Sequence, residues 1–141
     1  MLAQLEVDME VVESAALACT GLVALNPSPA QALSSRLRER VDLFIVNEGE
    51  FDALPEIHRA PLVVLTLGAK GAQLLQHGRL VASAPSIASR VVNTVGAGDA
   101  FAAAFTVALL RGRSHEDALR AASRVGAAAV GDARSQPEVQ G

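Results

Sequence analysis

Three largely apolar runs, at residues 21–25, 43–46 and 62–67, constrain the fold of this chain more than any other feature. Each run stops at a stretch that contains asparagine, proline or glycine, which are turn-forming residues. A strand with one wet face alternates apolar and polar residues, whereas continuous apolar strands are typical of a parallel sheet covered on both faces. The runs therefore predict an α/β fold.

Segments with helical spacing separate these runs. Further along the chain, His77-Gly78 has the character of a hairpin turn, and Gly112 and Ser114 are typical of a helix stop and the next N-cap. No linker or internal repeat divides the sequence, so we expect residues 1–141 to form a single domain. The expected elements are strands at 2–5, 21–25, 43–46, 62–67, 72–76 and 79–84, and helices at 9–19, 34–41, 97–110 and 114–130.

Composition excludes several classes of function. Half of the residues are apolar and 19% are charged, which predicts a globular chain. The net charge is −3 and no basic cluster is present, so nucleic-acid binding is disfavoured. Acidic residues interrupt the apolar N-terminus, unlike a signal peptide, and no apolar run reaches the roughly 18 residues that a bilayer span requires. We expect a cytoplasmic protein with neither a membrane nor a nucleic acid as its partner.

Cysteine and histidine show no spacing typical of a catalytic or metal site. Cys19 is the single cysteine, so it can form no internal disulfide, and we interpret it as a small buried hydrophobe. His58, His77 and His115 lie in or beside predicted turns without a matching serine or cysteine. All three are predicted to be surface residues.

The glycine-rich start of the helix at 97–110 is the strongest candidate for chemistry. Ligands of open α/β sheets bind beyond the carboxyl ends of the strands, where this helix begins. The small side chains of Gly96, Ala97 and Gly98 would let backbone N–H groups approach an anion. Asp99 could then accept a proton from a substrate hydroxyl while these amides stabilise a transferring phosphoryl group. The alternative is a tight strand-to-helix turn with an acid that only favours the helix dipole.

Two other sets of polar residues also follow predicted strands. Asn47 and Glu50 could help to hold a hydrated Mg²⁺, but a capping residue followed by an acid three positions on is also an ordinary helix start, and in isolation we favour that interpretation. Thr66, Gly68 and Gly71 could approach the phosphates of a nucleotide. Their spacing is not that of a P-loop.

Four motifs follow the predicted strands in order along the chain. They are Leu25-Asn26-Pro27-Ser28-Pro29-Ala30, Val46-Asn47-Glu48-Gly49-Glu50, Val64-Leu65-Thr66-Leu67-Gly68-Ala69-Lys70-Gly71 and Asn93-Thr94-Val95-Gly96-Ala97-Gly98-Asp99-Ala100-Phe101. Together they resemble the C-terminal half of the ribokinase-like (pfkB) carbohydrate kinases, with similar intervals and flanking strands from about residue 2 to residue 137. The last motif resembles the signature of the family by itself, and the first looks most like ribokinase proper.

The resemblance implies a three-layer αβα ribokinase-like fold with a mainly parallel central sheet. It also implies ATP-dependent phosphorylation of a sugar hydroxyl with Mg²⁺, so the expected partners are a nucleotide and a sugar. The implied site residues are Asp99 as the general base; Gly96, Ala97 and Gly98 as the anion hole; Asn47 and Glu50 near the metal and phosphates; and Thr66, Gly68 and Gly71, with Asn47, at the nucleotide.

The chain departs from the pattern of the family in four respects. Family members are roughly twice as long, so the implied fold is truncated and lacks the N-terminal half, with its sugar-binding motif and lid. Asn93 stands where the family usually has aspartate. The tail after Gly131 is short, and Arg134-Ser135-Gln136 replaces a glycine-alanine-glutamine element, which puts a requirement for a monovalent cation in doubt. Only about a dozen residues join Glu50 to Leu62, which predicts a shortened or lost crossover helix.

Two functions therefore stay open at the level of sequence. The chain is either the nucleotide-binding and catalytic portion of a sugar kinase, with little activity alone, or a non-catalytic nucleotide-binding or oligomerising remnant of such a kinase. Removing half of an α/β sheet exposes an edge and an apolar face. We therefore expect a homo-oligomer or pairing with the missing N-terminal half.

Overall fold

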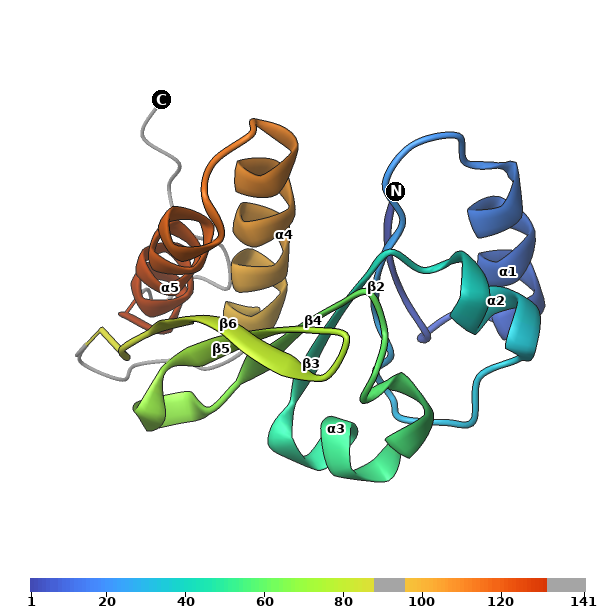
Figure 1. The fold of residues 1–141 in the computed structure, drawn as a ribbon, viewed down its shortest axis with the longest axis horizontal. Helices are drawn as coiled ribbons and strands as arrows, with labels where there is room; N and C mark the ends of the chain where they lie inside the picture. The colour runs from blue at the N-terminus through green and yellow to red at the C-terminus, as the bar shows by residue number, and fades with distance from the viewer. Residues whose placement is uncertain (88–95, 132–141) are drawn as a thin grey trace. The chain divides into compact units, whose positions relative to one another are not determined.

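The computed structural model describes residues 1–87 and 96–131. Contacts within the chain divide it into a first unit, Met1–Leu67 with Gln73–Val81, and a second unit, Gly68–Ala72 with Ala82–Gly141. The elements labelled in Figure 1, with two short 3-10 turns η1 and η2, are β1 (Leu2–Gln4), α1 (Met9–Ala18), β2 (Ala24–Asn26), α2 (Ser35–Arg40), β3 (Leu43–Asn47), α3 (Glu48–Ala53), η1 (Pro55–Ile57), β4 (Leu62–Thr66), η2 (Gly68–Lys70), β5 (Ala72–Gln76), β6 (Arg79–Ala84), α4 (Ala97–Leu110) and α5 (His115–Gly131).

The strands form one sheet in the order β1-β2-β3-β4-β5-β6, and its first four strands are parallel. This mainly parallel sheet confirms the α/β fold that the apolar runs predict. The register between β3 and β4 places Asn47 opposite Thr66, so the carboxyl ends of these strands are level. The crossover between them consists of the six-residue helix α3 and the turn η1, which is the shortened connection expected from the sequence.

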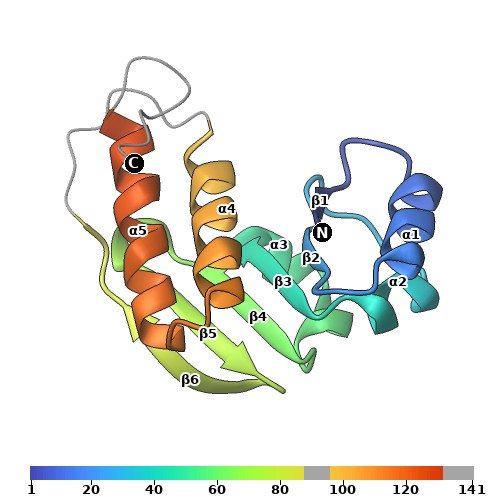
Figure 2. The same cartoon turned by 90° about the horizontal axis from the view of Figure 1, so that it is seen from above.

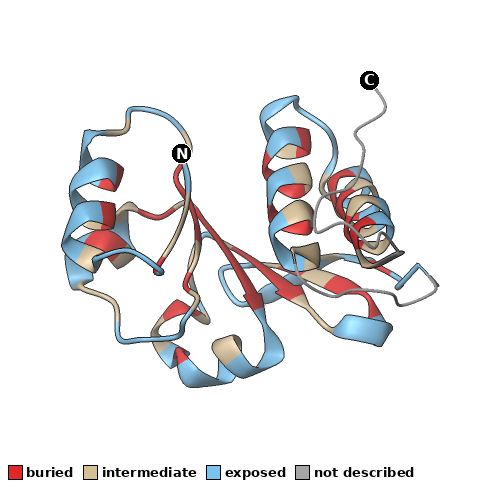
Figure 3. Cartoon of the chain, turned by 180° about the vertical axis from the view of Figure 1, so that it is seen from behind, coloured by how far each residue is buried: buried red, intermediate tan, exposed pale blue. Residues whose placement is uncertain are grey.

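The central strands of the first unit are buried on both faces. Ala24, Ile45 and Val64 lie on one face and are 0%, 3% and 0% exposed. Figure 3 shows this burial along the strands, with exposed residues at their tips. The alternate residues belong to a core cluster shared with α1 and α2, and its members include Val12, Ala16, Leu25, Leu37, Phe44, Val46, Val63 and Leu65. Burial on both faces is what a three-layer αβα fold requires.

A two-residue turn joins β5 to β6. His77 and Gly78 have φ angles of 50° and 81°, and positive values at both central positions are typical of the type I′ turn that matches the twist of paired strands. The hairpin predicted at His77-Gly78 is therefore confirmed. His77 donates its backbone N–H to Ala60 over 3.1 Å, which ties the turn to the segment that follows η1.

In the second unit, α4 and α5 lie side by side (Figures 1 and 2). Gly112, with φ of 72°, ends α4, because its N–H donates to Leu109 and the N–H of Arg113 donates to Ala108. Ser114 then caps α5 by accepting the N–H of Asp117 over 3.2 Å. Both helix signals read from the sequence are confirmed. Buried residues of the two helices include Phe101, Phe105, Leu119 and Ala122.

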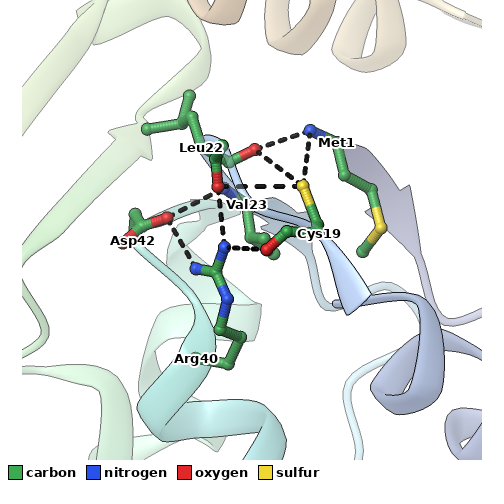
Figure 4. Close-up of polar contacts among 7 residues, drawn as sticks. Met1, Cys19, Leu22, Val23, Arg40 and Asp42 are labelled. Carbon is green, nitrogen blue, oxygen red and sulfur yellow. Dashed lines mark hydrogen bonds and ion pairs between the residues drawn. The ribbon is translucent and has the colours of Figure 1, made fainter. Parts of the chain in front are cut away.

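A cluster of polar contacts around Arg40 holds the amino ends of β2 and β3 (Figure 4). The Arg40 guanidinium donates to Asp42 over 3.0 Å and to the carbonyls of Cys19 and Gly21 over 2.8 and 2.7 Å. The same Asp42 oxygen accepts the N–H of Val23 over 2.8 Å. One side chain therefore fixes the two loops that lead into neighbouring strands.

Cys19 corrects the expectation of a buried hydrophobe. It follows the last residue of α1 and is only partly buried, and its thiol donates to the Gly21 carbonyl over 3.7 Å. The backbone of Gly21 is the main influence that holds the thiol pKa below its usual value. Partial burial opposes this shift, and the positive charges of the Met1 amino group and Arg40 add to it. The sequence predicted burial from residue type alone, whereas the position at a helix end decides the environment.

Candidate functional site

Asn47 and Glu50 form a reciprocal capping box at the junction of β3 and α3. The backbone N–H of Asn47 donates to Glu50 Oε2 over 3.0 Å, and the backbone N–H of Glu50 donates to Asn47 Oδ1 over 2.8 Å. These bonds satisfy two amides that would otherwise lack partners at the helix start. The capping interpretation favoured from the sequence is therefore confirmed.

Side chains from both neighbouring strands also fix the carboxyl end of β3. Asn26 Nδ2 donates to the Ile45 carbonyl over 2.6 Å, and Thr66 Oγ1 donates to the Val46 carbonyl over 3.2 Å. Thr66 stands opposite Asn47 in the sheet. The structure thus brings together three of the predicted site residues, Asn47, Glu50 and Thr66, at the carboxyl ends of β3 and β4.

The oxygen atoms at the carboxyl ends of β3 and β4 fit a divalent cation that takes few protein ligands. Within the described residues, Glu50 bonds only to Asn47 and uses only its Oε2 atom, so Oε1 remains for a cation or its water. Mg²⁺ commonly takes one or two carboxylates and completes its shell with water and phosphate oxygens. The described part of the chain holds no cluster of three or more histidine, cysteine, aspartate or glutamate side chains arranged for a metal.

The loop after β4 is a tight turn with two glycines of different character. Gly68 has φ of 55° with open space where a Cβ would stand. Gly71 has φ of 99°, and a Cβ there would lie 2.1 Å from the carbonyl oxygen of Ala84. The N–H of Gly71 donates to the Gly68 carbonyl over 3.1 Å and closes the turn. Close backbone packing therefore explains the glycine at position 71, whether or not a nucleotide lies nearby.

The start of α4 has the features that an anion site requires. Gly96 occupies the N-cap in a left-handed conformation with φ of 80°, and as a glycine it offers no side chain to cap the helix. The N–H of Ala100 makes the first helical bond, to Gly96, over 2.9 Å. The amides of Ala97 and Gly98 precede that bond and lie in the first turn, at the positive end of the helix dipole. Gly98 and Asp99 are exposed.

The second unit supports this helix start from one side. A Cβ at Gly126 of α5 would lie 3.5 Å from the Ala97 carbonyl and 3.4 Å from the Phe101 Cβ, so the two helices approach closely there. Asn93 and the element Arg134-Ser135-Gln136 lie outside the described residues. A single site that combines Asp99 with Asn47 and Thr66 stays a prediction.

His58 is a residue that sequence reasoning misjudged. It is partly buried, and its ring stacks on Phe51 with centroids 4.0 Å apart and planes 18° from parallel. Its Nε2 atom lies 2.7 Å from the Phe51 carbonyl oxygen. A partner seven positions away across a turn leaves no periodic signal in the sequence. The surface assignment holds for His77, which is exposed, and His115 is partly buried.

Parallel strands buried on both faces, with polar side chains at their carboxyl ends, define an α/β protein of the three-layer type. The chain belongs to the pfkB family of carbohydrate kinases, whose family model matches residues 5–140. Ribokinase from Haemophilus influenzae is 32% identical over 85% of this chain and 45% of the relative. Ribokinase from Bacillus subtilis is 33% identical over 92% of this chain and 48% of the relative.

Solved structures agree with this assignment. Ribokinase from Arabidopsis thaliana, complexed with ribose and ATP, matches with a TM-score of 0.87 and 28% identity, over 97% of this chain and 52% of that one. Ribokinase from Thermotoga maritima matches with a TM-score of 0.84 and 27% identity, over 96% and 51%. The fold is therefore ribokinase-like, and the chain spans about half the length of these relatives. No helix in the described ranges is long and apolar enough to cross a membrane.

Proposed function

We propose that the chain carries the nucleotide-binding and phosphoryl-transfer portion of an ATP-dependent sugar kinase. The observation that carries this proposal is the start of α4, where Gly96 in a left-handed conformation and the small residues Ala97 and Gly98 precede the exposed Asp99, in a chain that belongs to the pfkB family. The complex of Arabidopsis ribokinase with ribose and ATP supports a sugar and a nucleotide as the ligands. The reaction would take place in the cytoplasm.

Asp99 would act as the general base. Its carboxylate accepts the proton of the sugar hydroxyl while the hydroxyl oxygen forms a bond to the γ-phosphorus of ATP. The bond between that phosphorus and the bridging oxygen breaks, and ADP leaves. The amides of Gly96, Ala97 and Gly98 would stabilise the charge on the transferring group, because they lie at the positive end of the helix dipole.

The carboxyl ends of β3 and β4 would hold the phosphates of the nucleotide. Glu50 and Asn47 would face a Mg²⁺ ion, directly or through water, and the ion would neutralise phosphate charge when it is bound. Thr66 and Gly68 would approach the phosphates from the next strand end. Gly71 would shape this loop through its packing against Ala84.

A second candidate function is a non-catalytic module that oligomerises. The observation that favours it is the edge strand β6, on which Leu80 and Val81 are 57% and 46% exposed. An exposed apolar edge strand is a template for pairing with another chain, and the proposed occupant is the β6 edge of a second copy. Light scattering at micromolar concentration is expected to show a dimer. A monomer that stays monomeric on concentration would rule this pairing out.

Calorimetry with MgATP and MgADP tests the proposed nucleotide site. We expect binding of both, weakened in Thr66→Val, which keeps the shape of the side chain and removes its hydroxyl. Ser14→Ala serves as the control, since the Ser14 hydroxyl bonds only within α1. The absence of any heat of binding would refute the proposal.

A further inference from the structure

The helix that carries Glu50 is weak by itself. Helix α3 has six residues, includes Gly49, and contains no fully buried side chain. Isolated helices shorter than about 12 residues are marginal in water, and glycine lowers helix stability further. The position of Glu50 therefore depends on what holds the two ends of α3.

The capping box of Asn47 and Glu50 holds the first end. At the other end, the Phe51 carbonyl oxygen lies 2.7 Å from His58 Nε2 and accepts the Leu54 N–H over 3.3 Å. A carbonyl oxygen can only accept, so Nε2 must carry the proton that is shared. His58 thus adds a second, shorter hydrogen bond to one of the last carbonyls of α3.

The ring of His58 also stacks on the ring of Phe51. The stacked rings, 4.0 Å apart, join α3 to the turn η1, and Phe51 in turn packs against the core cluster of the first unit. The segment after His58 is anchored as well, because Ile57 is fully buried and Ala60 accepts the N–H of His77. His58, at the end of the anchored turn η1, therefore fixes Phe51, the residue next to Glu50, through both a hydrogen bond and a ring contact.

We propose that His58 is a positioning residue for the Glu50 carboxylate. It holds the C-terminal end of α3. This keeps the capping box closed and keeps the Oε1 atom of Glu50 in place at the carboxyl ends of β3 and β4. The role assigned to that carboxylate rests on the proposed function. The mechanical link from His58 to Glu50 does not.

Amide hydrogen exchange of the ligand-free protein, followed by NMR, tests the link. In His58→Ala, which loses both contacts, the amides of Asn47 and Glu50 are expected to exchange about tenfold faster. In His58→Phe, which keeps the stack and loses the donor, the expected acceleration is smaller, about threefold. His77→Asn is the matched control, since that side chain is exposed and asparagine tolerates a positive φ.

Core amides at Ile45 and Val64 provide the internal reference and should be unchanged. Equal acceleration at these core amides, or unchanged exchange at Glu50 in the variants, would overturn the proposal. If His58→Ala does not fold, His58→Phe decides the question by the same criterion.

Nucleotide titrations supply a second readout. His58→Ala is expected to reduce the gain in ADP affinity that Mg²⁺ provides and to leave metal-free ADP binding unchanged. An equal loss with and without Mg²⁺ would indicate a merely structural role and overturn the proposal. If the wild type shows no MgADP binding, the proposed function fails, and the exchange data still decide whether His58 positions Glu50.

Discussion

Asn47 and Glu50 bind each other's backbone amides across the first turn of α3, with N···O distances of 3.0 and 2.8 Å. The same pair therefore ends β3, begins α3 and leaves one oxygen of Glu50 outside the capping box. Capping and metal binding looked like alternatives in the sequence. The geometry makes them compatible, because capping uses Oε2 and fixes the rotamer of the carboxylate.

Glu50 variants separate the two roles. Glu50→Gln keeps an oxygen that can accept the Asn47 N–H, so stability should change by less than about 0.5 kcal/mol. Glu50→Ala keeps the Asn47 cap and loses the bond from the Asn47 N–H to Oε2, which costs about 1 kcal/mol. Both should weaken the Mg²⁺ dependence of nucleotide binding, whereas Asp52→Asn, which removes the same charge from the same helix, should not. Urea denaturation and calorimetry measure these effects, and unchanged Mg²⁺ dependence in both Glu50 variants would exclude Glu50 from the metal site.

The two glycines of the loop after β4 should respond very differently to alanine. Gly71→Ala is expected to cost about 3 kcal/mol or more, since its Cβ would meet the Ala84 carbonyl at 2.1 Å and φ is 99°. A Cβ at Gly68 would lie in open space, so Gly68→Ala should lose only about 1 kcal/mol of stability, from the left-handed backbone. Chemical denaturation of both variants measures the difference. Equal losses of stability would show that the close approach at Gly71 does not hold in solution.

Arg40 should contribute more to stability than its neighbour on α2. Arg40→Lys keeps the charge but cannot reach Asp42 and two carbonyls at once, and should lose about 1–2 kcal/mol. Arg36→Lys is the control, because the Arg36 side chain is 73% exposed and its ion pair is of little value. Thermal or urea unfolding provides the measurement. A loss in Arg36→Lys as large as that in Arg40→Lys would contradict this account.

The thiol of Cys19 should react as a low-pKa cysteine. Its pKa is lowered in the folded state, so alkylation by iodoacetamide should be faster near neutral pH than that of the unfolded chain and slower in Arg40→Gln. The folded pKa lies below the unfolded one, so the thiolate contributes stability above the unfolded pKa. That contribution is lost as pH falls through the folded pKa. An alkylation profile that titrates at or above the pKa of the unfolded chain would disprove the shift.

Most of the fold could be predicted because the signals are local. Continuous apolar runs identified β2, β3 and β4, the pair His77-Gly78 identified the hairpin, and Gly112 with Ser114 identified the turn between α4 and α5. Each of these depends on residues close in the sequence, whose backbone preferences act directly on the local conformation.

The remaining features depend on contacts that sequence spacing does not reveal. The ring of His58 stacks on Phe51 across a turn. The environment of Cys19 is set by loops that Arg40 holds together. Gly71 is explained by a backbone that passes over it from the end of β6. Glycine in such a loop is compatible with a nearby ligand, a close backbone contact or both, and only the structure reveals the contact with Ala84.

The most direct test of the central claim is the rate of phosphoryl transfer to a sugar in Asp99→Asn. The assay would use this chain together with a separate polypeptide that supplies the other half of the ribokinase fold. We predict that Asp99→Asn lowers the rate by about 100- to 10,000-fold, as the loss of a general base does, while MgADP affinity changes little and Asp52→Asn stays active. Transfer at the wild-type rate by Asp99→Asn, or no transfer by the wild type, would contradict the account.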